Sequence, residues 1–230
     1  MSIILGISGG NMQTNHELNK YALSLTGKEH PTVLFIPTAT HDPQEYIDYM
    51  ENYYHELGCT YLSLCLCLNT YTKDEIRALF EEADVIYVGG GDTGFLLDKW
   101  KECHVDEVIA EFYHKDKVFT GVSAGTVYWF HYDFSDTDMF KNPDHWEYRY
   151  LECLDYFPYA FCPHYNEPDK AQFDSRVSEQ RYSAIAMDND TALEIRGRHA
   201  VVRTFDPSKK AYFFDAWRGF EKREFTEIDL

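Results

Sequence analysis

Short apolar runs recur along the first half of the chain, and each is followed by a longer amphipathic stretch. Short runs rich in Val, Ile, Leu and aromatic residues are typical of buried strands, and apolar residues three or four apart indicate helices. Strands are predicted at Ile3–Ser8, Thr32–Pro37, Tyr61–Cys67, Val85–Val88 and Val118–Val122, and helices at His16–Leu25, Pro43–Leu57, Thr72–Glu82, Gly94–Lys101 and Val105–His114. This alternation predicts a parallel sheet with helices on both faces and right-handed crossovers.

The second half of the chain has a different pattern, because its apolar runs follow one another with little helical sequence between them. Further strands are predicted at Tyr159–Pro163, Ala184–Met187, Ala192–Ile195, Ala200–Thr204 and Ala211–Asp215. Turn sequences such as Asp188-Asn189-Asp190 separate them, so we expect antiparallel strands at an edge of the same sheet. There is no internal repeat or Pro/Gly/Ser-rich linker. The prediction is a single α/β domain over residues 1–230, a three-layer α/β/α sandwich.

Gly121-Val-Ser123-Ala-Gly125 directly follows the strand at Val118–Val122. A serine between two glycines at a strand-to-helix junction is the nucleophile-elbow pattern, and we expect residues 126–130 to continue as a buried helix. The glycines permit a sharp turn, which presents the serine hydroxyl at the edge of the sheet. The pattern alone is weak, because Gly and Ser also make ordinary turns.

A second glycine-rich segment, Gly89-Gly90-Gly91-Asp92-Thr93, follows the strand at Val85–Val88. It fits a tight turn in which Asp92 or Thr93 caps the next helix. Phosphate binding is disfavoured, because the G-x-x-x-x-G-K-[ST] pattern is absent. The third interpretation is half of an oxyanion hole, in which the amide of Gly91 works with that of Ala124, the residue after the elbow serine.

A serine nucleophile needs a base, which is usually histidine. Of the ten histidines, His164 ends a predicted strand, at the sheet edge where Ser123 is expected. Six others fall in predicted helices or beside them, and His131 lies one or two helical turns beyond Ser123. An acid or amide would orient the imidazole. The candidates are Asp138, Asp188, Asn189 and Asp190, each of which also fits a solvated turn or a cap.

The formal net charge of −18 argues against nucleic acid or an anionic membrane surface as a partner. No apolar run approaches the roughly 20 residues of a membrane span, and the first residues do not resemble a signal peptide. Cys65 and Cys67 share one face of a predicted strand, but no second ligand pair supports a metal site there. We therefore expect a cytoplasmic protein with reduced thiols.

Four motifs in order resemble the peptidase E / cyanophycinase group of serine peptidases, whose fold is similar to that of class I glutamine amidotransferases. They are Val33-Leu-Phe-Ile-Pro-Thr-Ala39, the segment Ile86–Leu97 with its three glycines, the G-x-S-A-G sequence at Gly121–Gly125, and Pro163-His164-Tyr165. The resemblance runs from Ile3 to about Phe214. Each motif is unspecific alone, but the combination in this order is specific.

The resemblance implies that Ser123 is the nucleophile, that His164 is the general base, and that the amides of Gly91 and Ala124 form the oxyanion hole. It implies two places for the third member. An acidic residue one short segment after the serine corresponds to Asp138, and a glutamate in a later turn corresponds to Asn189. An amide can orient a histidine, but it cannot stabilise the imidazolium as a carboxylate does.

The activity that the resemblance implies is a serine exopeptidase that hydrolyses short peptides, N-terminal aspartyl dipeptides among them, without a metal or cofactor. Arg176, in the predicted helix after His164, is the expected cation for an aspartate side chain, and pairing with Glu179 or Asp174 is the alternative. Other candidates are a cyanophycinase-like hydrolase and a non-catalytic small-molecule binding domain. Glutamine amidotransferase activity is disfavoured, because that chemistry uses a cysteine at the elbow.

Aromatic residues make up 17% of the chain and gather between Phe140 and Phe161. A cluster of this kind either covers a cleft or forms a contact between two copies of the chain, so a homodimer is one expectation.

Overall fold

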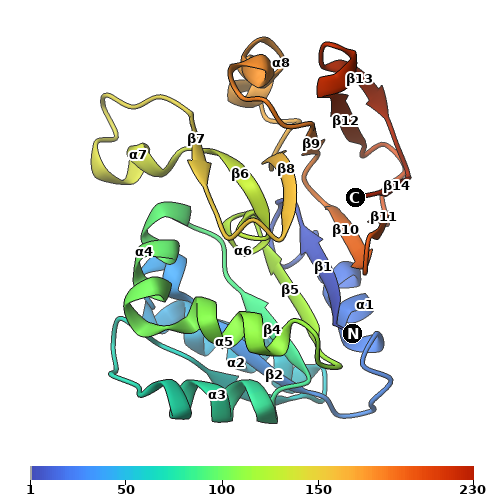
Figure 1. The fold of residues 1–230 in the computed structure, drawn as a ribbon. Helices are drawn as coiled ribbons and strands as arrows, with labels where there is room; N and C mark the ends of the chain where they lie inside the picture. Colours follow the sequence, from blue (N-terminus) through green and yellow to red (C-terminus); the bar gives the residue numbers. More distant parts are fainter. Residues whose placement is uncertain (1) are drawn as a thin grey trace.

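The computed structural model describes residues 2–230, and its strands form two mixed sheets (Figure 1). The eight-stranded sheet has the order β14-β11-β10-β1-β5-β4-β2-β3, and the six-stranded sheet has the order β13-β12-β9-β8-β6-β7. The strands are β1 (Ile3–Ile7), β2 (Thr32–Ile36), β3 (Thr60–Ser63), β4 (Val85–Val88), β5 (Val118–Val122), β6 (Phe130–Ser135), β7 (Arg149–Glu152), β8 (Phe157–Cys162), β9 (Ala184–Met187), β10 (Thr191–Arg196), β11 (His199–Thr204), β12 (Ala211–Asp215), β13 (Glu221–Glu224) and β14 (Glu227–Asp229).

The helices confirm the five predicted in the first half of the chain, and three short ones follow, of which α8 holds Arg176, as expected. They are α1 (His16–Ser24), α2 (Gln44–Glu56), α3 (Lys73–Glu82), α4 (Thr93–Cys103), α5 (Val105–Phe112), α6 (Ala124–Val127), α7 (Thr137–Lys141) and α8 (Phe173–Arg176). Four single-turn 3₁₀ helices lie at Thr38–Thr40, Pro168–Gln172, Val177–Glu179 and Ala216–Arg218. Within residues 2–230, no helix has the length and apolar character that a membrane crossing requires.

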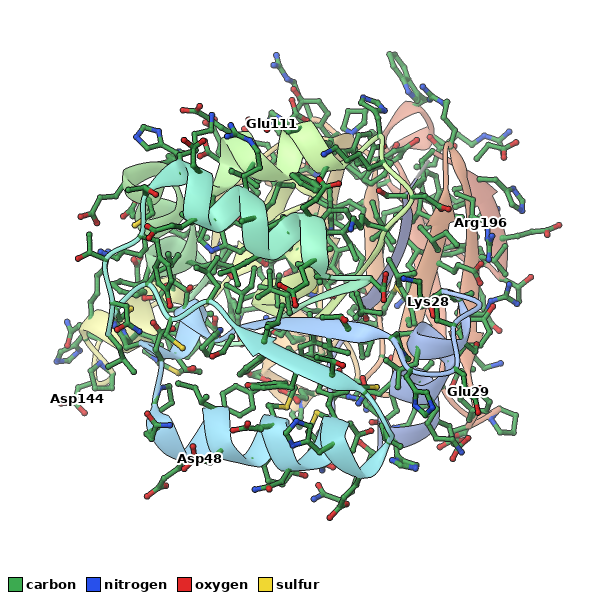
Figure 2. The ribbon with its side chains drawn as sticks, turned by 90° about the horizontal axis from the view of Figure 1, so that it is seen from below. Lys28, Glu29, Asp48, Glu111, Asp144 and Arg196 are labelled. Carbon is green, nitrogen blue, oxygen red and sulfur yellow. The ribbon has the colours of Figure 1, made fainter. Side chains whose placement is uncertain are left out.

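The parallel half of the large sheet, which is made of β1 to β5, forms because alternate residues of each strand bury on opposite faces. On β2, Val33 and Phe35 pack with residues of α2, whereas Leu34 packs with residues of α3. Viewed from below, the strands lie between α2, which carries Asp48, and the helices of the other face, where α5 carries Glu111 (Figure 2). This is the α/β sandwich that the sequence predicts.

The later strands divide between the two sheets. β10 pairs with β1 in antiparallel fashion and β11 extends the same edge, as expected, and β14, which the sequence did not predict, adds a further strand. The prediction that β8, β9 and β12 join this sheet is wrong, because they form the second sheet with β6. In Figure 1 the second sheet occupies the upper part of the molecule, beyond the ends of β1 and β5.

The prediction of a continuous helix over residues 126–130 is also wrong. Helix α6 ends at Val127, and Phe130 begins β6, which pairs with β8 in parallel. The aromatic ring of Phe130 stacks on that of Phe161, with their centroids 4.5 Å apart. Tertiary packing against β8 therefore decides the conformation of this apolar stretch, which periodicity alone does not distinguish from a helix.

Two other expectations concern cysteines and aromatic residues. β3 ends at Ser63, so Cys65 and Cys67 lie in the following turn and do not share a strand face; all six cysteines, which fall within residues 2–230, are free. Much of the aromatic cluster is core of the second sheet, where the ring of Tyr148 stacks on Phe134 at 4.9 Å. Phe140 is half exposed. A role of this segment in dimer formation stays a prediction.

Candidate active site

Ser123 occupies a sharp bend between β5 and α6. Its φ is 55° and its ψ is −114°, a conformation that L-residues rarely adopt and that is typical of strained functional positions. The Ser123 N–H donates to the carbonyl of Ile7 over 3.0 Å, which fixes the bend against β1. The sequence prediction of a sharp turn at Gly121–Gly125 is confirmed.

The two glycines of the elbow are required by close backbone packing. A Cβ atom added at Gly125 would lie 2.1 Å from the carbonyl oxygen of Val88, and one added at Gly121 would lie 2.5 Å from the same atom. Real Cβ atoms do not approach an oxygen so closely. Thr126 adds polar contacts, because its hydroxyl lies 2.7 Å from the carbonyl oxygen of Ile7. Backbone contact with β4 and β1 therefore sets the position of Ser123.

The structure brings His164 to Ser123. His164 Nε2 lies 2.8 Å from Ser123 Oγ, and His164 Nδ1 lies 2.7 Å from Asn189 Oδ1. The imidazole side chain is 25% exposed, so substrate and solvent can reach it. These distances allow proton transfer from the serine hydroxyl to the imidazole while the amide of Asn189 holds the far side of the ring.

Ser8 connects the His164 loop to both sheets. Its hydroxyl donates to the carbonyl of Met187, the last residue of β9, over 2.7 Å, and accepts the N–H of His164 over 3.1 Å. Ser8 directly follows β1 of the large sheet and is completely buried. His164 itself has a positive φ of 56°. His164 is therefore held at the junction of the two sheets.

Gly9 is a functional position that the sequence analysis missed. A Cβ atom there would lie 2.0 Å from Asn189 Oδ1 and 2.2 Å from His164 Nδ1, so only glycine leaves room for this hydrogen bond. The carbonyl of Gly9 also accepts the N–H of Asp190 over 3.1 Å. The signal in the sequence was Gly9-Gly10 directly after the first strand, at the edge where the other motifs gather.

The glycine-rich loop after β4 lies against the elbow. A Cβ atom on Gly90 would lie 3.4 Å from Ser123 Cβ, and Gly91 has a φ of 137° with Ala39 packed behind it. Within residues 2–230, no backbone acceptor takes the N–H of Gly91 or of Ala124. Asp92 also fulfils the alternative role, because its side chain accepts the N–H groups of two residues in the first turn of α4.

The other three candidates for the third member are engaged elsewhere. Asp138, on α7, accepts from Arg149 Nε over 3.1 Å. Asp188 accepts the N–H of Lys210 over 2.9 Å, and burial raises the pKa of its carboxyl. The carboxylate of Asp190 lies 3.8 Å from Lys209 Nζ. Of the four candidates, the structure brings Asn189 to the His164 ring.

Arg176 pairs with Glu179, which is the alternative that the sequence analysis gave to substrate binding. Its guanidinium donates to Glu179 from Nε and Nη2, each over 3.0 Å, at the end of α8. Asp174 pairs instead with Lys222 over 3.0 Å. No hydrogen bond joins Arg176 to Ser123 or His164 within the part of the chain that the structure describes. His131, on β6, lies 2.9 Å from a carboxylate oxygen of Asp155 and takes no part in the site.

A second residue that the sequence analysis missed is Glu167, three positions after His164. Its Oε1 atom accepts from Asn189 Nδ2 over 2.8 Å and lies 3.4 Å from His164 Nδ1. A side chain of the same turn contributes, because Asn166 Oδ1 accepts the backbone N–H of Asn189 over 2.7 Å. The i+3 spacing from a candidate base, within a turn that contains a proline, was the available signal.

Comparison with known proteins identifies the family of the chain. The model of peptidase family S51 matches residues 3–203. An uncharacterized peptidase of Bacillus subtilis (strain 168), YgaJ, is 31% identical over 199 residues, which cover 84% of this chain and 83% of that one. Peptidase E of Haemophilus influenzae (strain ATCC 51907 / DSM 11121 / KW20 / Rd) is 26% identical over 165 residues, covering 70% and 71%.

A solved structure of a peptidase from an acI-B1 Actinobacterium superimposes with a TM-score of 0.73 at 20% identity, covering 100% of this chain and 97% of that one. At this identity the likeness concerns the fold. The fold and the family match together define a serine-type peptidase. More specifically, the chain belongs to peptidase family S51.

Proposed function

We propose that Ser123 and His164 carry out amide hydrolysis on short peptides through an acyl-enzyme. The observation that carries this proposal is the 2.8 Å distance between Ser123 Oγ and His164 Nε2 at a strained bend. A hydroxyl so placed can pass its proton to the imidazole as its oxygen attacks a carbonyl carbon.

In the first half of the reaction, the Ser123 Oγ–C bond forms and the carbonyl electron pair moves onto oxygen. The N–H groups of Gly91 and Ala124 stabilise this oxyanion, since the protein backbone leaves both free to donate to it. His164 then gives its proton to the leaving amine, and the C–N bond breaks. In the second half, His164 takes a proton from water, whose oxygen attacks the ester carbon. His164 then returns that proton to Ser123 Oγ as the ester C–O bond breaks, which releases the acid and restores Ser123.

The test is labelling with a fluorophosphonate together with hydrolysis of a library of short peptides. Ser123→Ala and His164→Ala should each lower kcat by about 10⁴-fold while the protein keeps its melting temperature. The matched controls are Ser24→Ala and His55→Ala, which lie at exposed positions on α1 and α2 and should keep wild-type rates. Labelling that persists in Ser123→Ala, or a near-wild-type rate in either active-site variant, would exclude this mechanism.

The substrate we propose is a short peptide with an N-terminal aspartate, whose carboxylate is bound by Arg176. Support comes from the chemistry of the guanidinium, which binds a carboxylate through two parallel hydrogen bonds and already does so with Glu179. A substrate carboxylate would take the place of Glu179.

Arg176→Ala should raise KM for an aspartyl dipeptide by about tenfold and leave an alanyl dipeptide unchanged. Arg181→Ala is the matched control, because its guanidinium is exposed on the same segment and lies over the ring of Tyr182. Equal losses on the two substrates would mean that Arg176 has a structural role.

A further inference from the structure

A carboxylate stands beside the pair formed by His164 and Asn189. Glu167 Oε1 lies 2.8 Å from Asn189 Nδ2 and 3.4 Å from His164 Nδ1. A turn brings Glu167 back to the histidine, since the Glu167 N–H donates to the carbonyl of His164 over 2.8 Å. The side chain of Glu167 is 44% exposed. Four groups from three segments therefore form one chain of contacts: Glu167, Asn189, His164 and Ser123.

The chemistry of the Glu167 carboxylate fixes the direction of each hydrogen bond in this chain. An ionised carboxylate can only accept, so the NH₂ group of Asn189 must face Glu167 and its Oδ1 must face His164. Because that oxygen can only accept, His164 Nδ1 carries the ring proton. Nε2 is then the unprotonated nitrogen, and it faces the hydroxyl of Ser123. This is the tautomer that a general base requires.

Glu167 also provides the negative charge that Asn189 lacks. When Ser123 gives up its proton, His164 becomes a cation with the Glu167 carboxylate 3.4 Å from its Nδ1 atom. The acids of the neighbouring turn do not provide this charge, because Asp188 faces the N–H of Lys210 and Asp190 faces the ammonium of Lys209. Partial exposure to solvent weakens the attraction but does not remove it.

We propose that Glu167 is a positioning residue: it sets the tautomer of His164 through Asn189 and stabilises the imidazolium. The acidic function of a serine–histidine–acid triad is thus divided here between an amide that touches the ring and a carboxylate behind it. This inference rests on the proposed roles of Ser123 as nucleophile and His164 as base.

The experiment measures the second-order rate of labelling by a fluorophosphonate, which needs no knowledge of the substrate. Glu167→Gln should slow labelling by about tenfold. Asn189→Asp in the Glu167→Gln background places a carboxylate directly on Nδ1, so it should restore most of the rate. Glu152→Gln is the matched control, because this exposed glutamate pairs with Tyr132 near the start of β6, away from the His164 end of β8.

Two results would overturn the proposal. One is a labelling rate in Glu167→Gln within twofold of wild type. The other is a double variant that labels no faster than Glu167→Gln, because a carboxylate that only braces the loop is not replaced by one at position 189.

A pH titration of the His164 ring proton by NMR tests the same idea without turnover. The midpoint should lie at lower pH in Glu167→Gln than in wild type, and an unchanged midpoint would contradict the charge role. Failure of the proposed function looks different: wild-type protein would not label, or labelling would persist in Ser123→Ala. The NMR titration would then still show whether the Glu167 carboxylate interacts with the His164 ring.

Discussion

Ser123 and His164 meet at 2.8 Å, yet the molecule holds them by different means. Ser123 is fixed by backbone contact, where α6 and β5 touch β4 so closely that only glycine fits at positions 121 and 125. His164 is fixed by hydrogen bonds to the side chains of Ser8 and Asn189. The glycines that pack behind Ser123 are buried, whereas the surroundings of His164 are polar and partly exposed.

The difference shows what each half contributes. A nucleophile on a strained bend must be held against relaxation, and dense backbone packing does this without any titratable group. A base must change its charge during the reaction, so polar neighbours that respond to that charge serve it better. We therefore expect substitutions at the elbow around Ser123 to lower both stability and activity, and substitutions around His164 to lower activity alone.

Among substitutions around Ser123 and His164, the largest effect is expected for Gly125→Ala. The added methyl would lie 2.1 Å from the backbone oxygen of Val88, so α6 and β4 must move apart. We expect a loss of about 3 kcal/mol in the free energy of unfolding. Displacement of Ser123 should slow fluorophosphonate labelling by about 10³-fold. Urea denaturation and labelling kinetics measure the two losses, and an unchanged denaturation midpoint would contradict the packing argument.

Gly9→Ala should remove activity with little loss of stability. Its methyl would meet two side-chain atoms, Asn189 Oδ1 and His164 Nδ1, which can rotate away. Their hydrogen bond would then be broken, and labelling should slow by about 10²-fold. The free energy of unfolding should change by less than about 1 kcal/mol. If Gly9→Ala destabilises the protein as much as Gly125→Ala, the two halves are not built differently.

Thr126→Val measures the contribution of the Thr126 hydroxyl to the elbow and should have the smallest effect on the labelling rate. The hydroxyl of Thr126 is buried and lies 2.7 Å from the carbonyl oxygen of Ile7 and 3.0 Å from that of Gly121. Its loss should cost about 1–2 kcal/mol of stability and only a few-fold in labelling rate. Thr126→Ser keeps the hydroxyl and serves as the control. A loss of 10²-fold in rate would show that the elbow depends on this hydrogen bond.

The same contrast explains how far the sequence predicts this molecule. The parallel half of the large sheet follows from local periodicity, since the strands inside the edge strand β3 are mostly buried and each helix buries one face. The second sheet depends on the parallel pairing of β6 with β8. The apolar pattern of its strands does not show that they belong to a separate sheet. The buried aromatic run from Tyr128 to Phe130 fits a helix as well as a strand, so the sequence pattern predicted a longer helix than the structure has.

The elbow could be predicted from the sequence because its close backbone packing requires glycine at positions 121 and 125. The surroundings of His164 were less visible, because Asn189 and Glu167 come from segments 22 residues apart that meet only after folding. Four residues in the sequence fitted the role beside the imidazole, and only tertiary structure brings Asn189 to the ring. The i+3 spacing of Glu167 from His164 was the one signal in the sequence, and it does not distinguish Glu167 from a solvated acid.

Ser8 has a mechanical consequence. It links the last residue of β9 and the backbone of His164 to the end of β1, so the distance between Ser123 and His164 depends on how one sheet packs against the other. A small shift of the six-stranded sheet lengthens the distance between Ser123 Oγ and His164 Nε2 before any strand unfolds. As the urea concentration rises, the rate of fluorophosphonate labelling should therefore fall before the circular dichroism signal does. The labelling rate thus measures how well the two sheets stay packed together.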